Sequence, residues 1–287
     1  MISRLASIRG SLGPPAYEAE DVLIYKGDSL ALMAKLQDSP FNLTVTSPPY
    51  NIGKEYETAL NSEAYLGWCE TWIAEIFRLT AEHGAFWLNL GYFSLHGKAK
   101  AIPIAYLLWN RIPFYLLQEV VWQYGAGVAS RLSFSPRNEK FLWYVKNPGN
   151  YTFCLDAVRD PNVKYPNQKK NGKLKCNPLG KNPGDVWYFP KVTSGKNRSS
   201  KERTCHPAQF PVAVIDRIVK ACSLPGDVIF DPFLGSGTVV EVAIQNKRKV
   251  VGFELSDRYV STAVDRVEKA LSRAKYIEAQ GVLFPAV

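Results

Sequence analysis

The amino-acid sequence predicts an α/β protein built on a doubly wound, mostly parallel sheet of seven strands. Three observations point to this class. Short apolar runs alternate along the chain with longer stretches in which apolar residues recur with a helical period. A chain of 287 residues, 46% of them hydrophobic, is long enough to bury one large core. A glycine-rich turn also joins an apolar run to a helical stretch, as in α/β proteins that bind nucleoside cofactors.

Predicted strands and helices follow one another along most of the chain. Strands are expected at residues 22–25, 42–46, 85–90, 116–123, 140–145, 228–231 and 249–254. Helices are expected at residues 30–36, 62–82, 98–109, 209–222, 238–245 and 257–274. The helical period is clear after residue 62, where Leu66, Ile73 and Phe77 fall near one face. Such alternation favours a parallel sheet with helices on both faces.

The N-terminus and the cysteines indicate the setting of the protein. Residues 1–15 contain no continuous apolar segment, so we expect a short arm there and no secretory signal. No apolar stretch has the length of a membrane span. The cysteines form no CxxC pair, which predicts free thiols in a reducing cytoplasm and no metal site. They are Cys69, Cys154, Cys176, Cys205 and Cys222.

Residues 159–204 interrupt the alternation and carry the charge. They hold twelve Lys or Arg residues against three acidic residues, a surplus that equals the net charge of +9 of the whole chain. A solvated surface insertion would have this composition. A DNA-binding region built from loops would have it too, with cations on phosphates, and we favour that interpretation. Arg258, Arg266 and Lys269 of the last helix are expected to form its solvated face.

The glycine-rich turn follows the apolar residues 228–230 and reads Asp231-Pro232-Phe233-Leu234-Gly235-Ser236-Gly237-Thr238. Its glycines permit positive φ and let a ligand approach the backbone closely. The next predicted strand ends at Glu254, whose carboxylate can accept both hydroxyls of a ribose. A pyrophosphate-binding loop is the rival interpretation, but the spacing is GxGT and no Gly-Lys-Ser or Gly-Lys-Thr occurs. The turn therefore favours a nucleoside cofactor without phosphates.

A second motif, Thr46-Ser47-Pro48-Pro49-Tyr50, ends the apolar strand of residues 43–45. Two prolines donate no N–H groups and stiffen the chain, which leaves carbonyls free to point into a pocket. The Ser47 hydroxyl and the Ser47 or Pro48 carbonyl can then accept both hydrogens of an exocyclic amine and aim its lone pair at an electrophilic methyl group. Tyr50 can stack on an extruded base. Alone, the motif would equally fit a turn in which Pro-Pro merely ends a strand.

Together, the two motifs resemble those of the amino-DNA-methyltransferases, in which (S/N/D)PP(Y/F) is catalytic and FxGxGT binds the cofactor. The catalytic motif comes first here and a basic insertion separates the two, which is similar to the permuted β group of that family. The resemblance covers about residues 22–270. It implies a Rossmann-like methyltransferase sheet, S-adenosyl-L-methionine as cofactor and double-stranded DNA as substrate. It also implies a catalytic and cofactor-binding domain (residues 1–158 and 205–287) and a basic target-recognition insertion (residues 159–204).

The resemblance assigns further residues to the cofactor. Asp28 corresponds to a position near the adenine amine, and His206-Pro207 to a segment that closes over the methionine end. Pro232 and Phe233 would lie along the cofactor. The predicted catalytic residues are Ser47, Pro48, Pro49 and Tyr50. The predicted cofactor-binding residues are Asp28, His206, Pro207, Asp231, Pro232, Phe233, Gly235, Gly237, Thr238 and Glu254.

The expected reaction is direct methyl transfer to an amine of a flipped base, by alignment and polarisation of that amine. Cytosine C5 methylation requires a thiolate nucleophile, usually in a Pro-Cys pair, and no Pro-Cys occurs. In the family, Ser at the first motif position is commoner among cytosine-N4 enzymes and Asp among adenine-N6 enzymes. Ser47 therefore favours cytosine N4, with adenine N6 as the alternative.

Three other functions fit parts of the pattern. A protein glutamine methyltransferase uses a similar Asn-Pro-Pro-Tyr motif but places the cofactor motif first. An RNA base methyltransferase shares the chemistry, and a non-catalytic DNA-binding protein could share the fold. No nuclease motif occurs, so a cognate restriction endonuclease would be a separate chain. The recognition sequence and the oligomeric state stay open, a homodimer included, and the expected location is the cytoplasm of a bacterial or archaeal cell, at the nucleoid.

Overall fold

The computed structural model describes residues 4–38, 40–51, 53, 60–95, 97–127, 129–193 and 201–280. Nine strands form the main sheet: β1 (Tyr17–Ala19), β2 (Val22–Lys26), β3 (Phe41–Thr46), β4 (Thr80–Leu90), β7 (Tyr115–Gln123), β8 (Asn138–Val145), β11 (Val186–Tyr188), β12 (Val228–Asp231) and β13 (Lys249–Glu254). Their spatial order is β1-β2-β13-β12-β3-β4-β8-β7-β11. The five strands from β2 to β4 in this order run parallel. The predicted doubly wound, mostly parallel sheet is thereby confirmed.

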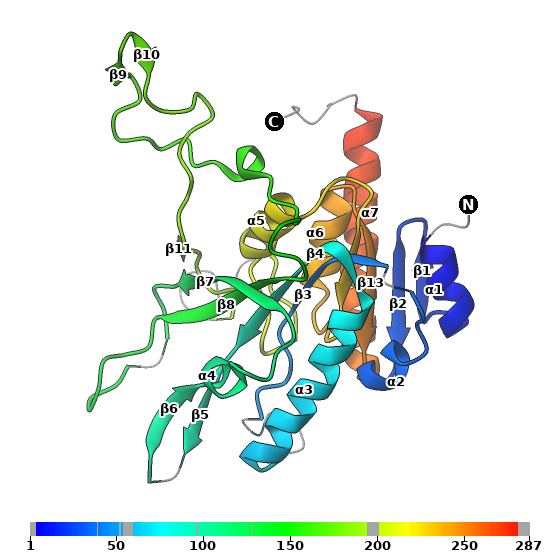
Figure 1. Ribbon diagram of the computed structural model, residues 1–287. Coiled ribbons are helices and arrows are strands. Elements are labelled where there is room, and N and C mark those ends of the chain that lie inside the picture. The colour runs from blue at the N-terminus through cyan, green and yellow to red at the C-terminus, as the bar shows by residue number, and fades with distance from the viewer. Residues whose placement is uncertain are drawn as a thin grey trace.

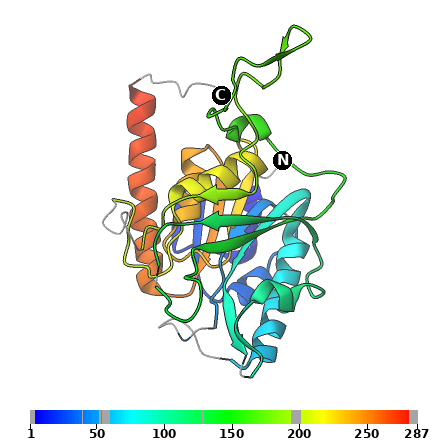
Figure 2. The same cartoon turned by 90° about the vertical axis from the view of Figure 1, so that its left-hand side faces the viewer.

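Helices cover both faces of the main sheet (Figures 1 and 2). One face carries α1 (Arg4–Leu12), α2 (Ser29–Met33), α3 (Ser62–Leu79) and α4 (Ile104–Leu108). The other face carries α5 (Val212–Cys222), α6 (Thr238–Gln245) and α7 (Asp257–Ala279). The sheet therefore separates two hydrophobic cores.

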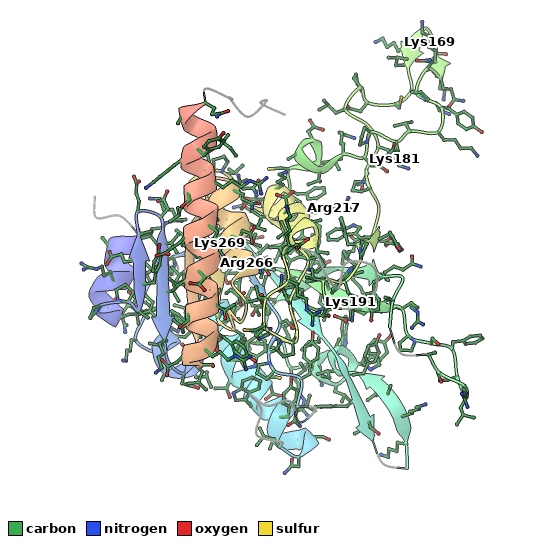
Figure 3. The ribbon with its side chains drawn as sticks, turned by 180° about the vertical axis from the view of Figure 1, so that it is seen from behind. Lys169, Lys181, Lys191, Arg217, Arg266 and Lys269 are labelled. Atoms are coloured by element: carbon green, nitrogen blue, oxygen red, sulfur yellow. The ribbon has the colours of Figure 1, made fainter. Side chains whose placement is uncertain are left out.

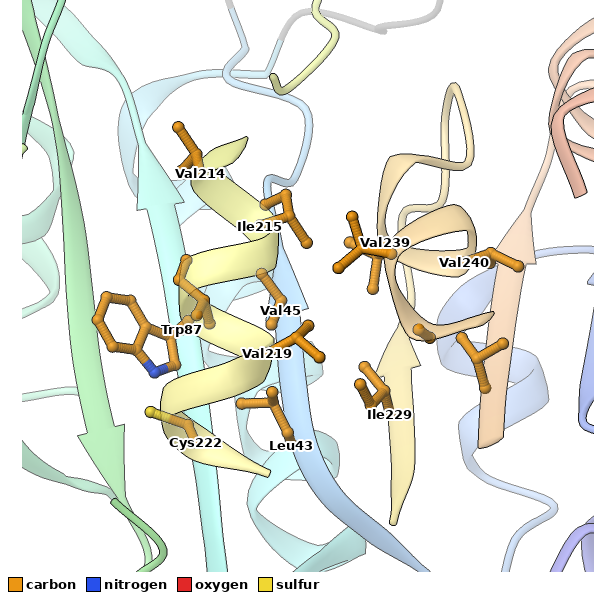
Figure 4. Close-up of a cluster of buried hydrophobic side chains, with 14 of the residues drawn as sticks. Leu43, Val45, Trp87, Val214, Ile215, Val219, Cys222, Ile229, Val239 and Val240 are labelled. Carbon is orange, nitrogen blue, oxygen red and sulfur yellow. The ribbon is translucent and has the colours of Figure 1, made fainter. Parts of the chain in front are cut away.

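Side chains of the central strands alternate between these two cores. In β3, Leu43 and Val45 belong to the core beneath α5, α6 and α7, whereas Phe41 belongs to the opposite core. Figure 4 shows the first core, with side chains of α5 facing those of β3 and β4. Strands buried on both faces need nearly continuous apolar sequences, which is why they are readable from sequence.

The winding direction of the chain reverses between β3 and β12, which are neighbours in the sheet. From β3 the chain passes through α3 to β4 on one side, and from β12 through α6 to β13 on the other. The loops at the carboxyl ends of β3 and β12 therefore diverge and leave a crevice, the usual position of a ligand in open α/β sheets. The two sequence motifs form these two loops.

The sheet has nine strands rather than the predicted seven. The two additional strands, β1 and β11, lie at its edges and have three residues each. An alternating pattern cannot be recognised over so few residues, so sequence periodicity misses them.

The structure also corrects several predicted boundaries: the helix predicted at residues 30–36 ends at Met33, the one at 209–222 begins at Val212, the one at 257–274 continues to Ala279, and the strand predicted at 85–90 begins at Thr80. The helix predicted at residues 98–109 is wrong over its first half, because β5 (Tyr92–Leu95) and β6 (Ala99–Pro103) form a hairpin and only α4 is helical. Pro103 disfavours helix at the residue before it and takes the N-cap position of α4. The helix predicted to residue 82 ends three residues earlier, since Thr80 is extended and begins β4. The N-terminal residues 1–15, predicted to be a short extension, contain α1, which buries Leu5 and Ile8.

Residues 161–179, here called the arm, project from the body of the protein (Figures 1 and 3). A short hairpin of β9 (Lys169–Lys170) and β10 (Lys173–Leu174) lies at its tip. At its base, Asp160 and Lys181 exchange backbone hydrogen bonds of 2.9 and 3.0 Å. The arm contains five exposed lysines and no acidic residue. These lysines are Lys164, Lys169, Lys170, Lys173 and Lys175.

After the arm the chain returns to the sheet as β11, which pairs in parallel with β7. Trp187 is buried there, with its ring stacked on Trp87 at 5.7 Å between centroids. The Arg217 guanidinium of α5 lies over the rings of Trp187 and Phe189, at 5.2 and 4.7 Å. Within the insertion predicted at residues 159–204, the segment around β11 therefore packs as part of the main body.

Among the described residues, none of the helices combines the length and the apolar character needed to cross a membrane. In the same part of the chain, no three His, Cys, Asp or Glu side chains are grouped so that they could hold a metal ion.

Candidate functional site

A pocket of about 900 Å³ lies at the carboxyl ends of the central strands. Its walls come from the loops after β2, β3, β12 and β13, from the ends of β4 and β7, and from residues 191–193 and 206–210. The two sequence motifs meet in it, since Thr46 Oγ1 donates a 2.7 Å hydrogen bond to Asp231 Oδ1 across 185 residues of sequence. The sheet topology alone brings these motifs together.

Thirteen of the fourteen predicted site residues line this pocket. They are Asp28, Ser47, Pro48, Pro49, Tyr50, His206, Pro207, Asp231, Pro232, Phe233, Gly235, Thr238 and Glu254. Gly237 is the exception, because it lies at the N-cap of α6 with φ +76°. A Cβ on Gly237 would lie 3.0 Å from Ala263, so close packing of α6 against α7 explains this glycine.

A chain of hydrogen bonds fixes the role that the Ser47 hydroxyl can play. The Asn89 amide donates through Nδ2 to the Lys140 carbonyl, 2.9 Å, so its oxygen faces the pocket. Tyr50 donates to Asn89 Oδ1, 2.5 Å, and Ser47 in turn donates to the Tyr50 oxygen, 2.8 Å. Because Ser47 uses its only proton in this chain, the lone pairs of Oγ are left to accept hydrogens from a ligand.

The Pro-Pro turn and the Tyr50 ring are held from both sides. Tyr65 of α3 donates a 2.6 Å hydrogen bond to the Pro49 carbonyl. Gly91 lies against the Tyr50 ring so closely that a Cβ there would stand 2.6 Å from Cδ2. A larger residue at position 91 would displace the Tyr50 ring. These contacts hold the Pro-Pro turn and the Tyr50 ring in a fixed position.

Asp231 is the most deeply buried carboxyl group of the pocket, with 3% of the residue exposed. Burial raises its pKa to about 7, although hydrogen bonds from Thr46 and from the Phe233 amide oppose the shift. A carboxylate in so dry a place gains most from a cationic partner. Asp231 therefore suits the positively charged part of a cofactor.

Glu254 is the last residue of β13 and lies beside Gly235 of the cofactor motif. It accepts hydrogen bonds from the Gly235 amide, 2.8 Å, and the Ser256 amide, 2.9 Å, and burial raises its pKa. Each oxygen keeps a lone pair for a hydroxyl donor. Gly235 has φ +53°, and a Cβ on it would lie 3.0 Å from His206 Nε2. The absence of a side chain at Gly235 thus lets the His206 ring pack closely against the backbone of the motif, and the positive φ favours glycine there.

Aromatic side chains form the wall beside the cofactor motif. The Phe233 ring packs against Trp68 and Trp72 of α3, with centroids 5.7 and 5.3 Å apart. On the other side, His206 packs edge-on against Tyr259 at 4.4 Å. Ser29 donates a hydrogen bond to the Pro232 carbonyl, which joins the start of α2 to the motif. These contacts hold the aromatic rings beside the cofactor motif in fixed positions.

These residues fit the adenosyl cofactor expected from the sequence. Glu254 offers acceptors for ribose hydroxyls, Phe233 and its neighbours offer an apolar wall, and Asp231 offers a buried carboxyl group that would suit a cation. Asp28 is the N-cap residue of α2, and its Oδ1 accepts a 2.9 Å hydrogen bond from the Ala31 amide. Its second carboxylate oxygen remains available to accept a hydrogen bond from an amine. The observation that supports this fit is Gly235, where a side chain would displace the His206 ring at the edge of the pocket.

Sequence patterns missed several residues of the pocket. Asn89 is the last residue but one of the strand predicted at residues 85–90, and its position near the carboxyl edge of the sheet is a signal that could have found it. Tyr65 and Trp68 lie on a helix whose apolar face conceals them among core residues. Glu139 and Lys191 come from the start of β8 and from beyond β11, and only the sheet order brings them to the pocket.

The prediction for the charged residues of α7 is wrong for Arg266, which is 7% exposed. Its guanidinium forms an ion pair with Glu241 of α6 and donates to Thr238 Oγ1 at 2.9 Å. Thr238 in turn donates to the Phe210 carbonyl, 3.3 Å. Arg266 therefore ties α7 to the start of α6 (Figure 3). Arg258 and Lys269 are exposed, as predicted.

Comparison with protein families and curated proteins finds clear relatives. A family model described as DNA methylase matches residues 41–265. The chain is 64% identical over 266 residues to the type II methyltransferase M.ScaI of Streptomyces caespitosus, a match over 93% of this chain and 88% of that protein. It is 30% identical over 272 residues to the DNA adenine methyltransferase YhdJ of Escherichia coli, a match over 92% of this chain and 88% of that protein.

Solved structures share the fold. The cytosine-N4-specific PvuII DNA methyltransferase superposes with a TM-score of 0.69 at 20% identity, over 90% of this chain and 93% of that one. The DNA modification methylase TTHA0409 of Thermus thermophilus, solved in complex with S-adenosyl-L-methionine, superposes with a TM-score of 0.61 at 21% identity, over 86% of this chain and 93% of that one. At these identities the likeness concerns the arrangement of strands and helices.

Proposed function

Because the chain belongs to the DNA methylase family, whose model matches most of its length, we propose that it transfers a methyl group from S-adenosyl-L-methionine to cytosine N4 in duplex DNA. The observation that carries this proposal is the polarity of the hydrogen bonds from Ser47 through Tyr50 to Asn89. It leaves a neutral hydroxyl as an acceptor in the same pocket as the cofactor motif.

S-adenosylmethionine would supply an electrophilic methyl group and leave as S-adenosylhomocysteine, and the methylated amine would release one proton to solvent. Ser47 Oγ and a neighbouring carbonyl of the Pro-Pro turn accept the two hydrogens of the target amine. An aromatic amine is planar because its lone pair is delocalised into the ring. Acceptors outside that plane favour the pyramidal form, in which the lone pair is available for attack. The protein thus contributes alignment and polarisation, which are large effects in reactions of this kind.

Direct transfer is further supported by the cysteines. Of the described residues that line the pocket, none is a cysteine. Burial raises the pKa of both the Cys69 and the Cys222 thiol to about 12, so neither is a thiolate near neutral pH. Among the described residues that line the pocket, methylation at cytosine C5 through a covalent enzyme–base adduct therefore finds no cysteine nucleophile.

The arm is the part of the chain that suits duplex DNA. Its five lysines stand on a projection without acidic residues, and Lys164 lies over the Tyr165 ring at 5.3 Å. Lysines on such a projection contact phosphates and set the register of the duplex. We assign target recognition to the arm and its return through β11, and the reaction to the remainder of the chain, residues 1–158 and 205–287.

The biological setting follows from the similarity to M.ScaI, a type II methyltransferase. We assign the chain to a bacterial restriction–modification system, acting on DNA in the cytoplasm beside a separate endonuclease. A single protomer holds every residue of the proposed mechanism, so a homodimer is compatible with the reaction and not required by it.

The test is to incubate the protein with methyl-labelled S-adenosylmethionine and mixed-sequence duplex DNA, digest the DNA to nucleosides and identify the label by mass spectrometry. The expected product is N4-methylcytosine. N6-methyladenine would overturn the choice of base and keep the cofactor and the site. Label in RNA or protein, offered in parallel, would overturn the substrate.

A further inference from the structure

One wall of the pocket holds a charged pair that the mechanism above does not use. Glu139 at the start of β8 and Lys191 beyond β11 both line the pocket, and Lys191 Nζ lies 2.5 Å from Glu139 Oε1. Their side chains are only 19% and 23% exposed. Burying an ion pair costs desolvation that its attraction barely offsets, so packing alone does not explain it.

Strand register places this pair close to the catalytic turn. β8 pairs antiparallel with β4 up to the partners Lys140 and Leu90, so Glu139 comes next to Gly91. Gly91 is the residue on which the Tyr50 ring lies. Adjacent strands are about 4.8 Å apart. The Glu139–Lys191 pair therefore stands one strand away from Tyr50, on the side of the pocket opposite the cofactor motif.

The pair is held in a fixed position. On β7, Trp122 is the register partner of Glu139, and its Nε1 donates to the Phe189 carbonyl at 2.7 Å. Lys191 Nζ lies 3.9 Å from the centre of the Tyr124 ring and 5.8 Å from that of Trp122. Burial lowers the pKa of the Lys191 ammonium, but the interactions with Glu139 and Tyr124 raise it by more, so that the pKa lies above its ordinary value. Lys191 is thus a charged donor near neutral pH.

We propose that Lys191, oriented by Glu139, donates a hydrogen bond to the N3 and O2 edge of the flipped cytosine and so selects the target base. This inference rests on the proposed cytosine-N4 function. An ammonium group has three donors, of which Glu139 and Tyr124 engage two, so one remains to be shared by N3 and O2 of the base. Cytosine presents N3 and O2 as adjacent acceptors beside its amine. Adenine presents one ring nitrogen beside its amine and then a C–H group, which cannot accept a hydrogen bond from an ammonium.

The geometry also explains why the pair is ionic. A neutral donor would be free to turn and serve as an acceptor, whereas an ammonium donates only. Glu139 lets this charge persist in a pocket that becomes dry when a base enters, since an unpaired buried ammonium would lose its proton. The wall around Trp122 and Tyr124 restricts the side chain to one direction.

The experiment compares wild-type protein with Lys191→Met on duplexes that carry the methylated site with cytosine, 3-deazacytosine or 2-thiocytosine at the target position. The site is first mapped with wild-type protein. We expect K191M to lower kcat/KM on cytosine by about 10- to 100-fold, the loss typical of a hydrogen bond to a charged group. At least one analogue should lower the wild-type value by a similar factor and lower the K191M value little further.

If the losses from K191M and from the analogue simply multiply, the inference is overturned. A substitution at a residue that does not contact the N3 and O2 edge lowers kcat/KM by the same factor on cytosine and on each analogue. The matched control is Lys220→Met, which breaks an ion pair with Asp216 on α5 (2.9 Å) away from the pocket. Lys191→Arg keeps a cationic donor and should recover part of the rate. Cofactor affinity and melting temperature of each variant report folding.

The two proposals fail differently in this design. If wild-type protein yields N6-methyladenine, the proposed choice of base has failed, whatever K191M does. If it yields N4-methylcytosine and the losses multiply, the proposed function stands and the role of Lys191 is refuted.

Discussion

The direction in which single hydrogen bonds run decides what the residues of this pocket can do. Asn89 donates to a backbone carbonyl, which turns its oxygen to Tyr50, and Tyr50 consequently receives the proton of Ser47. A serine hydroxyl is both donor and acceptor when it stands alone. Here its neighbours restrict it to accepting, which is the property that an amine nucleophile needs.

Replacing Tyr50 with Phe tests this polarity. The ring and its stacking surface remain, but Ser47 loses the acceptor for its proton and no longer presents lone pairs in one direction. We expect kcat to fall roughly 10-fold, the effect of one positioned hydrogen bond, with cofactor affinity unchanged. Single-turnover methylation and calorimetric cofactor binding measure the two quantities. Tyr276→Phe, at an exposed position on α7, serves as the control. A loss of cofactor affinity equal to the loss in kcat would contradict the role given to Tyr50.

Replacing Asp231 with Asn tests the cost of its burial. The Asp231 pKa is about 7 in the fold against an ordinary value of 3.8. An acid with a raised pKa favours folding most below pH 4 and loses that contribution as pH rises to 7. Without cofactor, the Asp231→Asn protein should therefore have a higher melting temperature than wild type at pH 8. The difference in unfolding free energy should be up to about 4 kcal/mol. The difference should shrink toward pH 4.

Calorimetric melting at several pH values, without cofactor, measures this difference. A gap between the two proteins that stays constant with pH would show that Asp231 does not titrate as its burial indicates. The same substitution should weaken cofactor binding at pH 8, because the carboxylate then faces a cation. Stability and binding thus change in opposite directions at one residue.

Among whole elements, the arm stands apart from the helices that form the cores, because it projects from the body of the protein. Its base is closed by the Asp160–Lys181 bridge, and Gly180 there has φ +112° with a Cβ position 2.2 Å from the Asp160 carbonyl oxygen. Only glycine fits that position. The sequence identified the arm through its charge, but the closure of its base depends on a contact that charge does not reveal.

Replacing Lys169, Lys170, Lys173 and Lys175 with Ser tests the arm. DNA affinity should fall, and the slope of log affinity against log salt should become shallower by about 3 to 4, because each phosphate contact contributes roughly 0.9. Binding isotherms on duplex DNA at several salt concentrations measure the slope. Cofactor affinity should not change, since the hairpin is far from the pocket lining. An unchanged slope would mean that DNA is bound elsewhere.

The fold of the whole molecule was largely predictable, and the reasons are physical. Central strands buried on both faces have apolar sequences that stand out, so β2, β3, β12 and β13 were found close to their true bounds. β1 and β11 were missed because three residues carry no period. Thirteen predicted site residues share the pocket because motifs at strand ends meet at one edge. Lys191 was missed because its position depends on a strand pairing that has no local signal.

The two halves of the site lie on opposite sides of the arm in sequence, yet they join within one sheet. Trypsin should therefore cut the exposed arm between Lys169 and Lys175 and leave the fragments associated through the strand pairs of the sheet. We expect two bands in denaturing gels, one peak in size-exclusion chromatography, retained cofactor binding and weakened DNA binding. Separation of the fragments, or loss of cofactor binding on cleavage, would show that the arm also holds the body together.

The pairing of β11 with β7 has a consequence for the fidelity of the reaction. The chain leaves the arm, runs three residues along the edge strand and reaches Lys191 three residues later. One continuous segment therefore connects the arm, to which we assign the duplex, with the residue that we place against the base. We expect a duplex that contacts the arm poorly to lose affinity at the arm and alignment of the base at Lys191, so an incorrect sequence would be penalised twice, once in binding and once in the reaction.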